Sequence, residues 1–283
     1  MNGIEVKNIS KRFGDILALD DVSLCFEENK IYGLLGRNGA GKTTLLNAIS
    51  NRIFPDQGEI YVSGLPATEN DKAQQQLFLM SEKTLYPERM KIKEVFYWTK
   101  SYYPNFDLAY AESLADKFQL DTKKRVRSLS TGYSSIFKII LALSANTPYV
   151  LLDEPVLGLD ANHRDLFYKL LIEKYSSNPC TIVISTHLIE EVSGIIEDIV
   201  IIKQGKIICR ESCESLLSKG YTVSGKASLV DTFIEGKKVI GADTLGGLKT
   251  AYILGSPAAD NVPSDLEVTR MDLQKLFIQL TNS

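Results

Sequence analysis

The sequence predicts an α/β protein that is built on a largely parallel sheet. Three short apolar runs, at residues 31–35, 149–152 and 181–185, are typical of strands buried on both faces. A stretch with helical periodicity follows the first run at 44–49, and another follows the second run at 161–175. Strands that alternate with helices in this way favour a parallel sheet.

A glycine-rich loop joins the first strand to its helix. It reads Gly36, Arg37, Asn38, Gly39, Ala40, Gly41, Lys42, Thr43, with Thr44 continuing into the helix. In the spacing Gly-x4-Gly-Lys-Thr, the glycines let backbone N–H groups turn toward phosphate oxygens, with the positive end of the helix behind them. Lys42 would add a charge for the phosphates, and the Thr43 hydroxyl would bind Mg²⁺. A plain surface turn is the alternative, but a strand before the loop and a helix after it argue against that.

Two adjacent carboxylates, Asp153 and Glu154, end the second apolar run. Open α/β sheets bind ligands at the carboxyl ends of their strands. Asp153 is suited to hold Mg²⁺ through its water shell, and Glu154 to take a proton from an attacking water. An ordinary strand cap is the alternative, which the presence of a phosphate-binding loop makes the weaker interpretation.

Three other features are weaker when each is taken alone. Phe13 lies on a predicted strand upstream of the loop, where it could be core or could stack on an adenine ring. Ser130 and Gly132 open a predicted helix, which is a weak anion-binding signal. His187 follows the third apolar run, and a structural and a functional role are equally compatible with that position.

The remaining periodicity divides the chain into two predicted domains. Short alternating strands come before and after the glycine loop, and a helical period runs from Ile92 to about Ala145. Beyond Gly220, short strands and a final amphipathic helix suggest a small α/β module. We therefore expect one domain over 1–219, with a helical subdomain at about 85–147, and an accessory domain over 220–283.

An aromatic stretch in the helical segment has two interpretations, a buried core or an exposed docking surface. Its members are Tyr97, Trp98, Tyr102, Tyr103 and Phe106. The general tendency of large apolar side chains to be buried favours the core.

Composition narrows the class of protein. Of the 283 residues, 32 are Lys or Arg and 35 are Asp or Glu, a net charge of -3, so we expect no nucleic-acid partner. The basic cluster Lys123–Arg127 is read as a solvated helix end. The four cysteines are too scattered for a metal site. No run approaches the roughly 20 apolar residues of a membrane span.

Taken together, the motifs resemble the ATP-binding subunit of an ABC transporter, over roughly Gly3 to Leu217. The matching segments, in the order of that family, are Phe13 for the adenine-stacking aromatic, Gly36–Thr43 for the Walker A loop, Leu129–Tyr133 for the signature, Tyr149–Glu154 for Walker B, Gly158–Asp160 for the D-loop and His187 for the switch histidine. The resemblance implies a phosphate-loop (P-loop) NTPase core with an antiparallel β subdomain and a helical subdomain.

The resemblance also implies an activity and partners. The chain would be an ATPase that uses ATP and Mg²⁺, with Glu154 and His187 as catalytic residues and Asp160 near the nucleotide. It would work at the cytoplasmic face of the cell membrane, bound to an integral membrane permease and to a second ATP-binding subunit. The tail resembles the C-terminal domain of bacterial exporters of the bacitracin-resistance and peptide-export kind, which suggests an exporter of peptides or antimicrobial compounds.

Two departures from the family pattern qualify this expectation. The signature reads Ser-Thr-Gly-Tyr, so Thr131 and Tyr133 replace a Gly and a Gln. The family's Gln that bridges Mg²⁺ to the membrane subunit has no counterpart, and Ser81 or Glu82 takes its place, with Glu82 preferred as a metal ligand. A weakened signature favours a heterodimer over a homodimer.

Two other functions compete with the transporter. A soluble ABC-type ATPase acting in translation or DNA repair usually carries two cassettes or a long charged coiled coil, and this sequence has one phosphate loop and no such coiled coil. A nucleotide-binding switch of another phosphate-loop class would not combine Asp153-Glu154 with a signature and His187.

Overall fold

The computed structural model describes residues 3–256 and 263–282, which divide into two compact units. The first unit runs up to His187 and also contains Val200–Cys209. The second contains Leu188–Ile199 and resumes at Arg210. Within the described residues, we find no helix with the length and apolar character that a membrane crossing requires.

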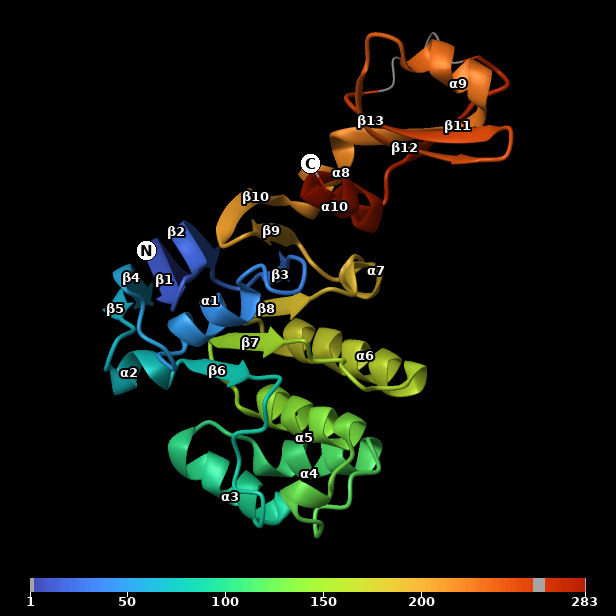
Figure 1. Ribbon diagram of the computed structural model, residues 1–283. Helices are drawn as coiled ribbons and strands as arrows, with labels where there is room; N and C mark the ends of the chain where they lie inside the picture. The colour runs from blue at the N-terminus through green and yellow to red at the C-terminus, as the bar shows by residue number, and fades with distance from the viewer. Residues whose placement is uncertain (1–2, 257–262, 283) are drawn as a thin grey trace. The chain divides into compact units, whose positions relative to one another are not determined.

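The central sheet has the strand order β10-β9-β3-β8-β7-β6 (Figure 1). The strands are β3 Ile31–Leu35, β6 Leu77–Met80, β7 Tyr149–Asp153, β8 Thr181–Thr186, β9 Asp198–Lys203 and β10 Lys206–Ser212. The neighbours β3 and β8, β8 and β7, and β7 and β6 run parallel. Every residue of these four strands is buried, because both faces of the sheet are covered. The predicted parallel α/β core is confirmed.

A second, antiparallel sheet has the order β2-β1-β4-β5. Its strands are β1 Gly3–Phe13, β2 Ile16–Glu27, β4 Gln57–Val62 and β5 Leu65–Pro66. In the β1–β2 register, Ile4 lies opposite Phe26 and Val6 opposite Leu24, and all four side chains are buried. Because side chains alternate along a strand, the exposed Lys7 falls on the other face. The buried face joins the core that also contains Leu45 of the helix after the glycine loop.

Helices cover the central sheet or form a layer beyond β6. They are α1 Lys42–Ile49, α2 Asp71–Gln74, α3 Ile92–Tyr102, α4 Leu108–Lys117, α5 Thr131–Ser144 and α6 Ala161–Ser177, with a 3₁₀ turn at Val126–Ser128. Figure 1 shows α3, α4 and α5 grouped together beyond the β6 edge. Side-chain oxygens of Asp107, Ser130 and Asp160 accept backbone N–H groups at the starts of α4, α5 and α6.

The predicted burial of the aromatic stretch is wrong for most of α3. Phe106 is buried, but Tyr97, Trp98 and Tyr102 are 66%, 53% and 70% exposed. The helical period places Ile92, Val95, Phe96 and Thr99 on the buried face of α3. The other aromatic residues of α3 therefore point away from that face, and they form an exposed aromatic surface.

The second unit is a small α/β module with its own core. Its sheet has the order β12-β13-β11-β14. The elements are α7 Ile189–Val192, α8 Cys213–Ser218, β11 Gly220–Lys226, α9 Ala227–Ile234, β12 Lys238–Leu245, β13 Leu248–Leu254, β14 Glu267–Arg270 and α10 Leu273–Asn282. The short strands and the final helix predicted beyond Gly220 are present as β12, β13, β14 and α10, whereas β11 and α9 were not predicted. Val223 of β11, Val230 of α9 and Ile253 of β13 meet in the core.

Gly58 of β4 provides a test of the packing between β4 and β1, the two central strands of the antiparallel sheet. Its φ is +84°, and a Cβ there would lie 2.3 Å from the Lys7 carbonyl oxygen and 2.4 Å from that of Asn8. Gly58→Ala should lower the free energy of unfolding by about 2–5 kcal/mol, combining left-handed strain and overpacking. Gly64→Ala is the control, because Gly64 also has a positive φ but open space around it. Equal losses in urea unfolding would contradict the packing argument.

Candidate nucleotide-binding site

The glycine loop connects β3 to α1 at the carboxyl edge of the central sheet. Gly39 and Gly41 have φ values of +80° and +113°, which favour glycine. A Cβ on Gly36 would lie 2.6 Å from the Ile202 carbonyl oxygen. The loop is anchored by the Ala40 carbonyl, which accepts the Gly205 N–H at 2.9 Å. Its shape therefore depends on glycine, and it leads into the N-terminus of α1, where N–H groups favour anions.

Lys42 lies at the start of α1 with its ammonium group under the loop. Nζ donates to the Gly36 carbonyl at 2.6 Å and lies 3.9 Å from Glu154 Oε1, and the residue is only 6% exposed. Burial lowers the pKa of Lys42, while the carboxylates of Glu154 and Asp153 raise it in part. The loop thus holds a nearly buried cation in a position to pair with the negative charge of a bound phosphate.

Asp153 is a buried carboxylate that accepts two hydroxyl groups. Thr43 Oγ1 donates to Oδ2 at 2.8 Å, and Ser185 Oγ donates to Oδ1 at 2.9 Å. Burial raises the pKa of Asp153, whereas these hydrogen bonds and the charge of Lys42 lower it. A hydroxyl and a desolvated carboxylate are the hard oxygen ligands that Mg²⁺ prefers, so Thr43 and Asp153 fit this ion.

Glu154 follows at the end of β7 in a left-handed conformation, with φ +47°. Its backbone N–H donates to the Ser185 carbonyl at 2.8 Å. Its Oε2 lies 2.9 Å from His187 Nδ1 and accepts the Thr186 hydroxyl at 3.3 Å. Three groups thus fix the orientation of a carboxylate that could accept a proton at the mouth of the site.

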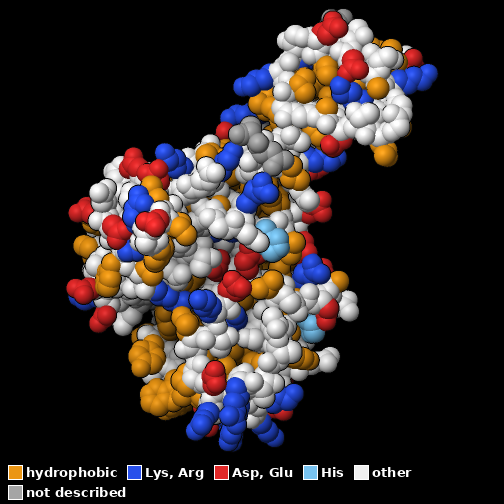
Figure 2. All heavy atoms as spheres, in the orientation of Figure 1, with side chains coloured by type: hydrophobic (Ala, Val, Ile, Leu, Met, Phe, Trp, Pro, Cys, Tyr) orange, Lys and Arg blue, Asp and Glu red, His pale blue; other side chains and the backbone are white. Residues whose placement is uncertain are grey.

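Lys42, Thr43 and Glu154 share one cleft of about 570 Å³. Residues 38–44 line it together with Glu82, Glu154 and His187. Figure 2 shows acidic side chains beside a histidine in a hollow on the first unit. The Glu82 carboxylate raises the pKa of Asp153, although burial is the larger cause. The structure therefore brings Glu82 into the same site as the predicted metal and phosphate residues.

The other predicted site residues lie outside this cleft. Phe13 is half exposed beyond the lining, with Lys11 Nζ 5.5 Å from its ring centroid, and Ile16, Leu17 and Ala18 line the cleft instead. Ser130 lines an adjoining cleft that also contains Glu154. Asp160 accepts the His163 backbone N–H at 2.9 Å as the cap of α6.

The fold and the cleft define the class of this protein as a phosphate-loop nucleotide-binding protein. A family model described as ABC transporter matches residues 19–157. The ABC transporter ATP-binding protein YtrB of Bacillus subtilis is 33% identical over 201 residues, covering 69% of this chain and 69% of YtrB. NatA of the same organism is 33% identical over 225 residues, covering 75% of this chain and 91% of NatA.

Solved structures show the same fold. The ATP-binding subunit of an ABC transporter superposes with a TM-score of 0.69 at 23% identity, covering 76% of this chain and 92% of that one. A dimeric ATP-binding cassette bound to ADP and Pi gives a TM-score of 0.66 at 23% identity, covering 74% and 98%. With the sequence relatives, these findings show that the chain belongs to the ATP-binding proteins of the ABC transporter family, whose members are ATPases.

Two residues of the site, Ser185 and Gln204, were not predicted from the sequence. Ser185 ends a predicted strand and carries no motif signal, yet its hydroxyl holds Asp153. Gln204 lines the cleft from the turn between β9 and β10. Both lie at the carboxyl edge of the sheet or in a turn beside it, so only the strand order could have indicated them.

We expect Lys42→Ala to weaken ATP binding by about 10- to 100-fold, because a hydrogen bond to a charged group contributes about 1.5–3 kcal/mol. Equilibrium dialysis with ATP measures the change. Lys72→Ala, which alters an exposed lysine of α2, should bind ATP normally. Unchanged affinity in Lys42→Ala would contradict the assignment of the phosphate loop.

We expect Glu154→Gln to retain ATP binding but to hydrolyse ATP about 10²–10⁴-fold more slowly, because the amide cannot accept the proton. Phosphate release measures the rate. Glu112→Gln, at an exposed position of α4, is the matched control. If Glu154→Gln hydrolyses ATP at the normal rate, the proton acceptor is another group, and His187 is the next candidate.

Proposed function

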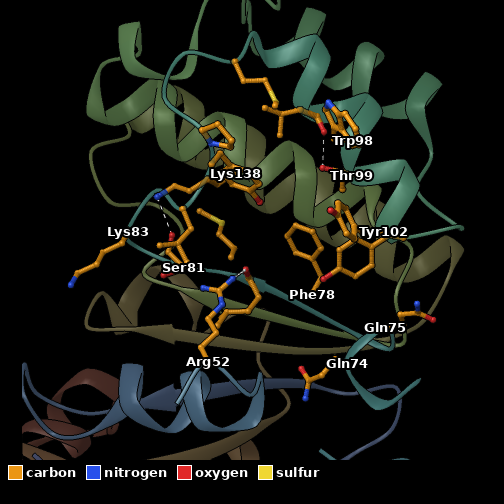
Figure 3. A pocket seen from close by; sticks show the side chains of 18 of the residues that line it. Arg52, Gln74, Gln75, Phe78, Ser81, Lys83, Trp98, Thr99, Tyr102 and Lys138 are labelled. Carbon is orange, nitrogen blue, oxygen red and sulfur yellow. Dashed lines mark hydrogen bonds between the residues drawn. The ribbon is translucent and has the colours of Figure 1, made fainter. Parts of the chain in front are cut away.

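We propose that the chain is the ATP-hydrolysing subunit that powers a membrane ABC transporter. The observation that carries the proposal is a groove of about 730 Å³ between β6, the residues that follow it, and α3 (Figure 3). The exposed Trp98 and Tyr102 line it, together with Phe78 and Tyr103. An open apolar groove with aromatic walls has the character of a site for an amphipathic helix of a partner protein.

We propose that this partner segment belongs to an integral membrane permease and that the chain works at the cytoplasmic face of the cell membrane. The groove supports this because its wall and the nucleotide cleft share one stretch of chain. Ser81 and Lys83 line the groove, whereas Glu82 between them lines the nucleotide cleft. A helix seated in the groove would therefore lie against the same segment that faces the nucleotide.

We propose roles for the site residues from the geometry of the cleft and, for Phe13, which lies outside its lining, from the family resemblance. Residues 36–44 would bind the phosphates, Phe13 would contact the adenine, and Thr43, Asp153 and Glu82 would hold Mg²⁺. Mg²⁺, when bound, supplies charge neutralisation at the phosphate oxygens. Glu154 would accept a proton from the attacking water. His187 would hold the Glu154 carboxylate in place through their 2.9 Å contact.

We further propose that the transporter is an exporter of peptides or antimicrobial compounds and that residues 220–283 are an accessory domain. The support is the resemblance of this tail to the C-terminal domain of bacterial exporters. Import is the competing direction, because the relatives include proteins named for petrobactin import in Bacillus subtilis and galactose import in Mannheimia succiniciproducens. Transport assays in vesicles of opposite orientation distinguish the two directions.

The altered signature supports pairing with a different ATP-binding subunit. A Cβ on Gly132 would lie 2.6 Å from the Gly158 carbonyl, and one on Gly158 would lie 3.0 Å from Thr131 Cγ2. Tyr133 lies edge-on to His163, with 6.3 Å between ring centroids. Thr131 and Tyr133 thus lie against the D-loop and α6. The backbone of this signature is therefore less accessible to the nucleotide of a partner subunit than the backbone of the family's glycine-rich signature.

The purified chain should therefore show weak ATPase activity and little ATP-driven dimerisation, with both rising when the partner ATP-binding subunit and permease are added. Thr131→Gly should raise the activity of the isolated chain, because it removes the Cβ and methyl group from the signature. Thr131→Ala, which keeps the Cβ, should gain less. Brisk turnover and dimerisation of the unmodified chain alone would exclude the heterodimer.

A further inference from the structure

Helix α5 carries a buried cation that the nucleotide site does not use. Lys138 is 5% exposed and follows the buried Phe137 within residues 136–143 of the helix, whose other members are all apolar. Its Nζ donates to two backbone carbonyl oxygens, that of Ser81 at 3.0 Å and that of Glu82 at 2.6 Å. Figure 3 shows the ammonium group reaching across to Ser81. A buried charge is costly without such partners, so these two hydrogen bonds account for its burial.

Lys138 binds the start of the segment 81–85, and this segment separates two hollows of the first unit. Ser81, Lys83 and Leu85 line the groove beside α3. Glu82 and Thr84 line the clefts on the opposite side, and Glu82 reaches the nucleotide cleft itself. Successive side chains thus alternate between the groove and the clefts, so a shift of this short segment changes both at once.

Lys138 itself borders both sides of the segment. It lines the groove and also the adjoining cleft that contains Ser130 and Glu154. Burial lowers the pKa of Lys138, while the carboxylates of Glu82 and Asp153 raise it. The ammonium group is therefore within electrostatic reach of two acids of the proposed metal site.

We propose that Lys138 is a positioning residue that couples the nucleotide cleft to the groove by fixing the backbone of Ser81 and Glu82. The proposal rests on the proposed function of the two hollows. A cation on α5 holds this segment through its backbone carbonyls, whatever side chains the segment bears. Occupancy of the cleft, sensed by Glu82, then changes the groove through the carbonyls bound to Lys138.

Trp98 provides a reporter for this coupling. It is the one tryptophan in the sequence, it lines the groove, and it is half exposed. Its fluorescence therefore reports on the groove and not on the nucleotide cleft, whose lining does not include it. The probe is a non-hydrolysable ATP analogue with Mg²⁺, added to the full chain. Equilibrium dialysis measures binding of the analogue independently of the fluorescence.

We expect the unmodified chain to show a saturable change in Trp98 emission that follows analogue binding. Lys138→Met, which keeps the length of the side chain but removes the donors, should bind the analogue within about threefold of normal affinity and lose the emission change. Lys138→Arg should retain it, because the guanidinium still donates to carbonyls. Lys93→Met, at an exposed position of α3, is the matched control.

The possible outcomes separate this inference from the proposed function. If the unmodified chain does not bind the analogue, the proposed function fails. If it binds but Trp98 does not respond, or if Lys138→Met keeps the full response, the coupling role is wrong while the function stands. Thermal melting shows whether Lys138→Met is folded. If it is not, Lys138→Gln, whose shorter side chain cannot reach both carbonyls, replaces it with the same expectation.

Discussion

The pair of hydrogen bonds to the buried Asp153 carboxylate is the constraint on which the rest of the site depends. They come from Thr43 at the start of α1 and from Ser185 near the end of β8. Removing a carboxylate from water costs free energy unless donors replace the water, so the two hydroxyls must remain in place. Because Thr43 is the last residue of the glycine loop, fixing its hydroxyl also fixes the loop relative to the sheet.

The parallel sheet explains how distant parts of the chain reach the same site. Thr43 and Asp153 are separated by 110 positions, yet their strands end at one edge because β3, β8 and β7 run in the same direction. Glu154 leaves that edge in a left-handed conformation, which costs about 1–2 kcal/mol for a residue with a Cβ. Its backbone bond to Ser185 helps to offset this cost and directs the carboxylate toward His187.

The features that the sequence predicted correctly are those that depend on short-range patterns of residues. Continuous apolar runs indicated the buried strands, and the spacing of the glycines and of Lys42 indicated the phosphate loop. Prediction from the sequence failed where the outcome depends on contacts between distant segments: Trp98 was predicted to be core, but α3 buries its opposite face. Strand β11 was missed because its partner β13 follows it only after α9 and β12. The contact of Lys138 spans 57 positions and involves carbonyl groups that every residue has, so no motif could show it.

Helix α5 carries both the altered signature and the buried cation Lys138. Its first turn carries the altered signature from Ser130 onward, and Lys138 lies about 12 Å further along the helix axis. Ser135 also binds the Leu157 carbonyl at 2.7 Å, which ties the middle of the helix to the loop after Glu154. In the proposed coupling, a displacement at the signature would carry the Lys138 ammonium with it, because both lie on one continuous helix. The altered signature at one end and the buried cation further along therefore lie on the same helix, so the proposed pairing and the proposed coupling would both act through α5.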